Sequence, residues 1–220
     1  MREVTVVVTS FDRLDLLKDT IDSFNGANSY FIEKFIIIDD SDNREMHDEI
    51  RRLYPNYLIL TEGHKGLVEC IDQAYSLVTT PYVWHTEDDF HYEKGSFIEK
   101  GLVVLKSDKT LMSLGIRYRE DLGGYPILPD ILSAEGVEYQ IAGESEGWYG
   151  FGFQCSLRSM ESYNRVKPYL QWAPPDIFIT WREQKIGQAY KDLGYRSAIL
   201  MDGYVRHTGK LRSTYGLYMS

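Results

Sequence analysis

The sequence contains only two cysteines, Cys70 and Cys155, among its 220 residues. Because they lie far apart in the sequence, they form neither a disulfide framework nor a metal-binding pair, and we expect buried free thiols. Positive charge is also scarce, since 24 Lys and Arg stand against 33 Asp and Glu, which leaves a net charge of −9. This balance argues against a nucleic-acid backbone as the main partner.

Long hydrophobic runs are missing as well. No apolar stretch approaches the roughly 20 residues that a membrane-spanning helix needs. The chain opens with Met1-Arg2-Glu3 and a strand pattern rather than with a signal peptide, so we expect a cytoplasmic protein without a membrane span. With 43% hydrophobic and 26% charged residues, the composition is that of a folded globular protein. The length predicts one domain over residues 1–220.

The first part of the chain, residues 1–92, shows short β-branched runs that alternate with helical periodicity. Strands connected by helices pair in parallel, because a parallel pair needs a crossover connection. We therefore predict an α/β fold with an open, mostly parallel sheet that has helices on both faces, and we assign this half to nucleotide binding. The predicted strands are 4–9, 35–38, 57–60 and 82–85, and the predicted helices are 14–24, 44–53 and 66–77.

The second part of the chain, residues 93–220, has a less regular pattern. A Gly-, Pro- and Tyr-rich stretch at 123–152 separates the predicted elements, and no repeat or linker divides the chain. We assign this half to acceptor binding. The predicted helices are 96–105 and 176–185, and the predicted strands are 110–118 and 196–205.

Polar clusters follow three of the predicted strands. Ligands of open parallel sheets bind beyond the carboxyl ends of the strands, so we expect these clusters to meet in one crevice. Consecutive carboxylates repel one another, and a hard cation such as Mn²⁺ or Mg²⁺ relieves that repulsion while leaving positions open for phosphates. No Gly-rich loop follows the first strand, which argues against a dinucleotide fold or a P-loop. The clusters are Thr9-Ser10-Phe11-Asp12-Arg13, Asp39-Asp40 and Glu87-Asp88-Asp89.

These motifs, in this order, resemble the GT-A fold of family 2 glycosyltransferases over roughly residues 4–90. Residues 5–13 are similar to the opening strand and turn of the family, and 36–41 to the second strand, whose acid receives the nucleotide base. Residues 63–67 with 71–74 resemble a Gly-initiated helix. Glu87-Asp88-Asp89 stands where the family carries an Asp-x-Asp metal motif, although the first acid here is Glu87.

The resemblance continues in the second half. The segment 174–182 resembles the helix that supplies the catalytic base in inverting members, which implies that Asp176 is the base. The segment 205–210 is similar to a late strand and loop that offers a histidine to the metal, here His207. Arg206 and Lys210 flank that histidine and suit a diphosphate. Trp148 and Tyr149, between glycines, suit a sugar platform.

The function implied by the resemblance is metal-dependent, inverting transfer of a sugar from a nucleoside diphosphate sugar to a hydroxyl of a glycan or other acceptor. A UDP-sugar is the favoured donor, and Asp89, Glu87 and His207 are the expected ligands of Mn²⁺ or Mg²⁺. Should Asp176 only cap its helix, Asp130, Glu144 and Glu146 are the next candidates for the base. The expected donor contacts are Thr9, Ser10, Phe11, Asp12, Arg13, Asp39, Asp40, Lys65, Gly66, Glu87, Asp88, Arg206 and Lys210.

Two alternative functions stay open at this point. One is a sugar-phosphate nucleotidyltransferase, which resembles this fold but carries a Gly-rich loop with Arg and Lys after the first strand. The segment from Thr9 to Leu14 has neither glycine nor lysine. The other is a non-catalytic carbohydrate-binding domain, which the presence of Glu87-Asp88-Asp89 together with Asp176 disfavours.

Overall fold

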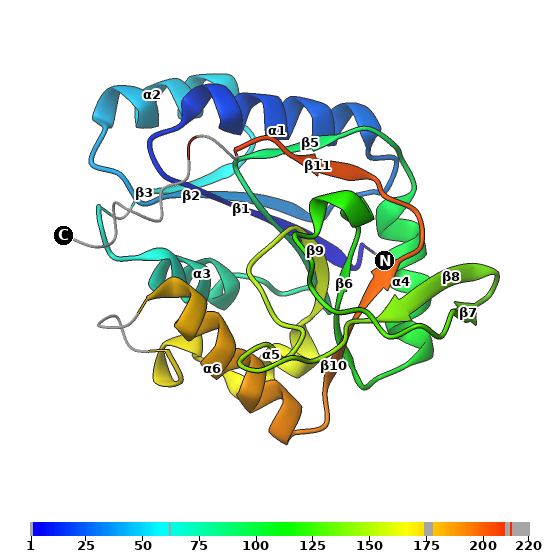
Figure 1. Ribbon diagram of the computed structural model, residues 1–220. Coiled ribbons are helices and arrows are strands. Elements are labelled where there is room, and N and C mark those ends of the chain that lie inside the picture. Colours follow the sequence, from blue (N-terminus) through cyan, green and yellow to red (C-terminus); the bar gives the residue numbers. More distant parts are fainter. Residues whose placement is uncertain (1, 62, 174–177, 210–211, 213–220) are drawn as a thin grey trace.

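The computed structural model describes residues 2–61, 63–173, 178–209 and 212 (Figure 1). A nine-stranded sheet runs through the molecule in the order β3-β2-β1-β4-β9-β6-β10-β8-β7. Among these described strands only β9 and β8 run against the others. The strands are β1 (Val4–Ser10), β2 (Lys34–Asp39), β3 (Leu58–Thr61), β4 (Tyr82–Glu87), β6 (Leu111–Gly115), β7 (Leu132–Ala134), β8 (Val137–Ile141), β9 (Ser156–Ser159) and β10 (Arg196–Leu200).

Helices cover both faces of the sheet, because successive residues of a buried strand point to opposite faces. Val6 and Val8 pack into the core beneath one set of helices, whereas Val7 packs into the core beneath the other. Figure 1 shows α1 and α2 above the sheet and α3, α5 and α6 below it. The helices are α1 (Leu14–Ala27), α2 (Arg44–Leu53) and α4 (Phe97–Ser107) on the first face, and α3 (Leu67–Ser76), α5 (Met160–Val166) and α6 (Ile179–Asp192) on the second.

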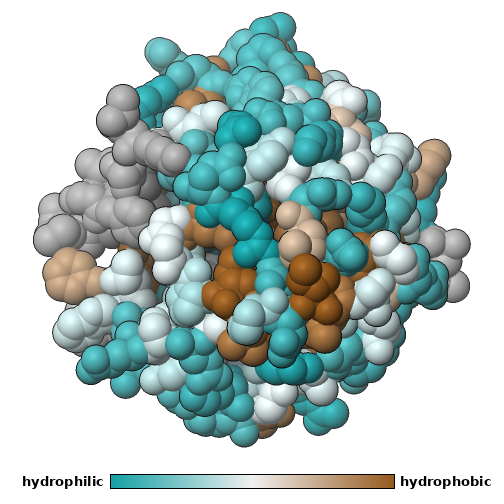
Figure 2. Space-filling model, turned by 45° about the vertical axis from the view of Figure 1, so that its right-hand side comes forward, coloured by the Kyte–Doolittle hydropathy of each residue, from teal (hydrophilic) through white to brown (hydrophobic). Residues whose placement is uncertain are grey.

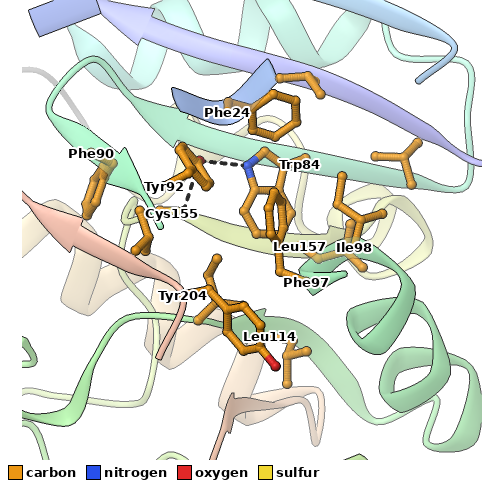
Figure 3. Close-up of a cluster of buried hydrophobic side chains, with 14 of the residues drawn as sticks. Phe24, Trp84, Phe90, Tyr92, Phe97, Ile98, Leu114, Cys155, Leu157 and Tyr204 are labelled. Atoms are coloured by element: carbon orange, nitrogen blue, oxygen red, sulfur yellow. Dashed lines mark hydrogen bonds between the residues drawn. The ribbon is translucent and has the colours of Figure 1, made fainter. Parts of the chain in front are cut away.

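The larger core is rich in aromatic rings (Figure 3). Trp84 of β4 is fully buried, and its indole N–H donates to the Tyr92 hydroxyl at 2.9 Å. That hydroxyl lies 3.3 Å from Cys155 Sγ. Burial raises the pKa of the Cys155 thiol to about 12, so it stays neutral. Cys70 is also buried and unbridged, which confirms the expectation of two free thiols.

A second, two-stranded sheet joins β5 (Phe90–Tyr92) to β11 (Val205–His207). The prediction of a single strand at 196–205 is therefore wrong. The chain leaves the main sheet after Leu200, and β11 belongs to the second sheet. Gly203 lies in the connection, where a Cβ atom would stand 2.2 Å from the Tyr118 ring. This close approach leaves no room for a side chain, and it turns the chain toward the acidic end of β4.

The fold class and the elements of the first half are confirmed, whereas the second half corrects several boundaries. Strand β6 ends at Gly115, short of the predicted Tyr118. The hairpin β7–β8 and the central strand β9 were not predicted. The sequence of β9, Ser-Leu-Arg-Ser, has a single hydrophobic residue, so its burial between β4 and β6 leaves no periodic signal.

The surface in Figure 2 is mainly hydrophilic, as expected for a chain with 26% charged residues. Figure 2 shows a largely hydrophilic face with hydrophobic atoms grouped near its centre. Among the described helices, none is both long and apolar enough to cross a bilayer.

Candidate active site

The Arg13 side chain ties the ends of β1 and β4 together. Its Nε donates to Asp88 Oδ2 at 3.1 Å, its Nη2 bonds to Asp88 Oδ1, and its Nη1 donates to Asp89 Oδ2 at 3.0 Å. The Ser10 hydroxyl and the Phe11 N–H also donate to Asp88 Oδ2, at 3.0 and 3.4 Å. Burial raises the pKa of Asp88 to about 6, against the opposing effect of Arg13. Arg13 thus relieves part of the repulsion among the acids, and Asp88 holds the turn after β1.

The structure brings together Asp89 and His207, two of the side chains expected to bind the metal. His207 Nε2 lies 3.3 Å from Asp89 Oδ2, and Thr208 N–H donates to the Asp89 carbonyl at 2.8 Å. Burial works to raise the pKa of Asp89, but the bond to His207 and the charge of Arg13 outweigh it and lower that pKa. Asp89 Oδ1 is buried and has no hydrogen-bond partner in the described part of the chain.

Glu87, at the end of β4, faces several other acids. Its pKa lies well above the usual range because of burial, and then because of the charges of Asp89, Glu183 and Asp88. Carboxylates in such surroundings accept a cation readily.

The acidic end of β4 can bind a divalent cation only if the substrate supplies some of the ligands. Within residues 2–61, 63–173, 178–209 and 212, no three His, Cys, Asp or Glu side chains converge on one point. Mg²⁺ commonly takes one or two carboxylates and completes its shell with water and phosphate oxygens. Asp89, whose Oδ1 has no partner among the described residues and whose Oδ2 lies 3.3 Å from His207, matches that kind of site.

Asp39 lies at the end of β2, in the crevice beside β1. Its Oδ1 accepts the Ser41 N–H at 3.0 Å and lies 3.0 Å from His47 Nε2, and its Oδ2 accepts the Asp12 N–H at 3.3 Å. Asp12 adopts a left-handed φ of 52°, which directs its N–H inward. Asp39 is thus fully buried and held in one orientation, with both oxygens in contact with the protein. On the neighbouring strand β1, the Thr9 hydroxyl is buried without a partner among the described residues.

Asp40 joins β2 to the start of α3. Its two carboxylate oxygens accept the backbone N–H groups of Lys65 and Gly66, at 2.7 and 2.8 Å. Gly66 has a φ of 105°, which a residue with a side chain rarely adopts. Asp40 therefore holds the loop that carries Lys65, and each of its oxygens accepts a backbone N–H of that loop.

We predict that Asp40→Ala destabilises the protein by about 2–3 kcal/mol. The change removes a charged acceptor and leaves two N–H groups unpaired, each of which is costly to strand. Chemical denaturation followed by circular dichroism measures the loss. Asp42→Ala is the matched control, because Asp42 is exposed and only approaches His64, at 3.5 Å. A loss at Asp40 no larger than at Asp42 would contradict the structural role.

Glu183, on α6, is an acid that the sequence interpretation missed. It is 9% exposed, and its Oε1 accepts the Phe153 N–H at 2.7 Å. Burial raises its pKa to about 7, although the Phe153 N–H and the charge of Arg158 act to lower it. A signal was present: Glu183 falls at helical spacing with Ile179, Ile186 and Tyr190, on the apolar stripe of the helix. An acidic residue on the apolar stripe of a helix indicates a buried carboxyl group.

The structure separates the two predicted platform residues. Trp148 stacks on Tyr125 with ring centroids 4.2 Å apart, beside a cavity. Tyr149 instead lies under the Lys191 ammonium, 4.9 Å from the ring centroid. Lys191 also pairs with Glu144 at 2.5 Å, which ties up one of the alternative acids at the surface.

Arg206 does not extend toward the acidic strand ends. Its guanidinium pairs with Glu93 at 2.9 Å and Glu120 at 3.4 Å, and lies 4.1 Å from the Tyr118 ring centroid. These partners take up the positive charge that the sequence interpretation assigned to a diphosphate. Asp176 and Lys210 lie outside the described residues.

Comparisons with known proteins identify the family and the fold. The sequence matches the family described as glycosyl transferase family 2 over residues 5–167. No curated protein matches the chain. Among solved structures, it resembles mannosyltransferase PcManGT from Pyrobaculum calidifontis, in complex with GDP-Man and Mn²⁺, at 16% identity with a TM-score of 0.70, covering 97% of this chain and 59% of that one.

A second similar structure is residues 1–349 of TarS from S. aureus, at 10% identity with a TM-score of 0.60. The match covers 95% of this chain and 61% of that one. The chain therefore spans about three fifths of the solved chains it matches, and at these identities the likeness shows the fold alone.

Proposed function

Because this chain belongs to glycosyl transferase family 2, and is therefore an enzyme that transfers glycosyl groups, we propose metal-dependent, inverting transfer from a nucleoside diphosphate sugar. The acceptor is a hydroxyl of a glycan or another molecule. The observation that supports this proposal is that acidic side chains with two different roles lie close together beyond the strand ends. Glu87 and Asp89 suit a cation, and Glu183, with its pKa raised to about 7, suits a proton.

The donor nucleotide is proposed to bind across the ends of β1, β2 and β4. The proposed contacts for the base are the Thr9 hydroxyl, which has no partner among the described residues, and Asp39 Oδ2, which accepts the Asp12 N–H at 3.3 Å. Lys65 lies on the loop that Asp40 holds, and we propose that its side chain contacts phosphate. UDP is the nucleotide we expect first, and GDP is the alternative because PcManGT was solved with GDP-Man and Mn²⁺.

The proposed metal site consists of Asp89, with Glu87 and His207 beside it. The cation, when bound, neutralises charge on the diphosphate as it leaves. Arg13 is the cation nearest to Asp89 in the protein itself, at 3.0 Å, and we propose that it orients Asp89 and keeps that carboxylate ionised. Such fixed positive charge at a site of developing negative charge lowers the barrier without reorganisation.

The base in our proposal is Glu183, and Asp176 is the alternative. A base accepts a proton best when its pKa lies near the working pH, and a value of about 7 meets that condition. Glu183 is held by the Phe153 N–H, which leaves its second oxygen to take the proton from the acceptor hydroxyl. The acceptor oxygen then attacks the anomeric carbon from the face opposite the diphosphate, which inverts the configuration.

The function is tested by incubating the protein with UDP- and GDP-sugars, with and without Mn²⁺. We expect slow, Mn²⁺-dependent release of the nucleoside diphosphate without an acceptor, and faster release with one. Release of pyrophosphate from a nucleoside triphosphate and a sugar phosphate would instead identify a nucleotidyltransferase. NMR of the transferred sugar gives the anomeric configuration, and retention would refute the inverting mechanism.

A further inference from the structure

A cavity of about 60 Å³ lies on the sheet face opposite the larger core, in the second half of the chain. Leu114 and Leu157 point from β6 and β9 into that core. Residues next to them in the strands, Ser113, Gly115 and Ser156, line the cavity. Strands normally fill a buried face with branched side chains packed at high density. Small and polar residues at these positions leave space that the protein itself does not fill.

The walls of the cavity combine apolar atoms with unused hydrogen-bond donors. Leu122, Ala142 and Ile199 contribute apolar surface. Arg117 and Trp148 also line it, and Arg117 Nε and Trp148 Nε1 are buried donors without a partner among the described residues. A buried donor left unpaired is costly, so a ligand that brings an acceptor oxygen gains more here than one that brings another donor.

Two stacked aromatic rings line the cavity, near the proposed base. Tyr125 and Trp148 stack at 4.2 Å with an angle of 18° between their planes. Aromatic rings of this kind pack against the apolar faces of sugar rings. Gly152 also lines the cavity, and a Cβ atom there would stand 3.4 Å from Glu183 Oε1. The cavity is therefore within reach of the group that must touch the acceptor.

We propose that this cavity is an acceptor subsite that takes the acylamino substituent of a sugar whose ring rests on Tyr125 and Trp148. The carbonyl oxygen of the substituent accepts from Arg117 Nε or Trp148 Nε1, and its methyl group meets Ala142 and Ile199. The cavity, of about 60 Å³, has room for a substituent of a few heavy atoms. The inference rests on the proposed transferase function and specifies its acceptor.

The test measures binding rather than turnover, so that it stands apart from a test of transfer. The probes are the methyl glycosides of N-acetylglucosamine, N-acetylgalactosamine and N-acetylmannosamine, each paired with the parent sugar that has a hydroxyl in place of the acylamino group. Ligand-observed NMR titrations are run with UDP or GDP and Mn²⁺ present. We expect at least one N-acetyl sugar to bind roughly tenfold more tightly than its parent, the usual size of a pocket-based preference.

Two variants locate the preference. Gly115→Val puts a side chain into the cavity, and its Cβ atom makes ordinary contacts with Ile199 Cγ1 at 3.8 Å and the Ala198 carbonyl oxygen at 3.9 Å. Circular dichroism of the variant checks that it folds. Gly115→Val should remove the preference while nucleotide binding stays unchanged. Trp148→Phe keeps an aromatic ring beside Tyr125 but removes the indole N–H, and should reduce the ratio of N-acetyl-sugar to parent-sugar affinity severalfold. Gly26→Val is the control, because a Cβ atom there meets nothing within 4 Å.

Three results would overturn the inference. The first is equal binding of all three N-acetyl sugars and their parents. The second is a preference that survives Gly115→Val. The third is a preference seen only between UDP-N-acetylglucosamine and UDP-glucose, which would move the subsite from the acceptor to the donor. A failure of transfer with intact sugar binding would count against the proposed function alone.

Discussion

Replacing Glu183 with glutamine is expected to lower kcat at least 100-fold while leaving nucleotide affinity unchanged, since a positioned base contributes roughly 10²–10⁴-fold. Glutamine keeps the size of the side chain and can still accept the Phe153 N–H, but it cannot take a proton. Steady-state transfer assays give kcat, and calorimetry with UDP or GDP and Mn²⁺ gives the affinity. Equal losses in kcat and in nucleotide affinity would point to a disturbed fold instead of a lost base.

Asp176→Asn and Glu161→Gln complete this experiment. Asp176 is the base that the family resemblance implies, and its asparagine variant should retain activity if Glu183 is the base. Near-normal turnover in Glu183→Gln with a loss in Asp176→Asn would reverse the assignment. Glu161 is an exposed glutamate on α5, and its change should leave both readouts at wild-type level.

The raised pKa of Glu183 also has consequences for pH. Activity should rise with pH through about 7, as the carboxyl loses its proton, and Glu183→Gln should lack this limb. Burying the ionised form lowers stability once the pH exceeds the unfolded pKa near 4.5, and the cost reaches its full size above about 7. The glutamine variant should therefore be more stable by roughly 1–3 kcal/mol at pH 7, with no gain below pH 4.5. Urea unfolding at both pH values checks the sign.

The first half of the fold was predictable because its strands are simple. β1, β2 and β4 are continuous buried runs, and parallel pairing follows from the helices between them. The second half depends on contacts distant in sequence. β9 enters the centre of the sheet with Arg158 buried on it, and β11 leaves the main sheet to pair with β5. The periodicity of hydrophobic residues within a short segment does not predict which strands β9 and β11 pair with.

The candidate site shows the same division. The meeting of Arg13 with Asp88 and Asp89 follows from parallel strand ends, and so does the place of Asp39. The sequence did not reveal that the carboxylate oxygens of Asp88 and Asp40 accept hydrogen bonds from the protein itself. Glu183 was missed because a charged residue in a helix is usually solvated. Its place on the apolar stripe of α6 was the one sequence signal of burial, and the bond from the Phe153 N–H shows how the buried carboxyl is held.

Asp89→Asn is expected to reduce Mn²⁺-dependent affinity for UDP or GDP by about 10- to 100-fold, the range seen when the immediate surroundings of a bound metal are altered. Asparagine offers a neutral oxygen in place of a carboxylate, which a hard cation binds poorly. In a chelator, wild type and variant should bind the nucleotide equally, because the contacts at Asp39 do not involve Asp89. Calorimetry with and without Mn²⁺ measures the difference between the two conditions.

The fold of this variant needs its own check, because Asp89 also pairs with Arg13 and lies 3.3 Å from His207. The lowered pKa of Asp89 means that its ionised form contributes stability above its unfolded pKa, and this contribution is lost as the pH falls. Asp89→Asn should therefore unfold somewhat more easily at pH 7, although Arg13 keeps its bonds to Asp88. Asp19→Asn, an exposed acid 2.9 Å from His91, is the control. Unchanged Mn²⁺ dependence in a folded Asp89→Asn protein would exclude Asp89 as a metal ligand and leave Glu87 and His207 to be tested in the same way.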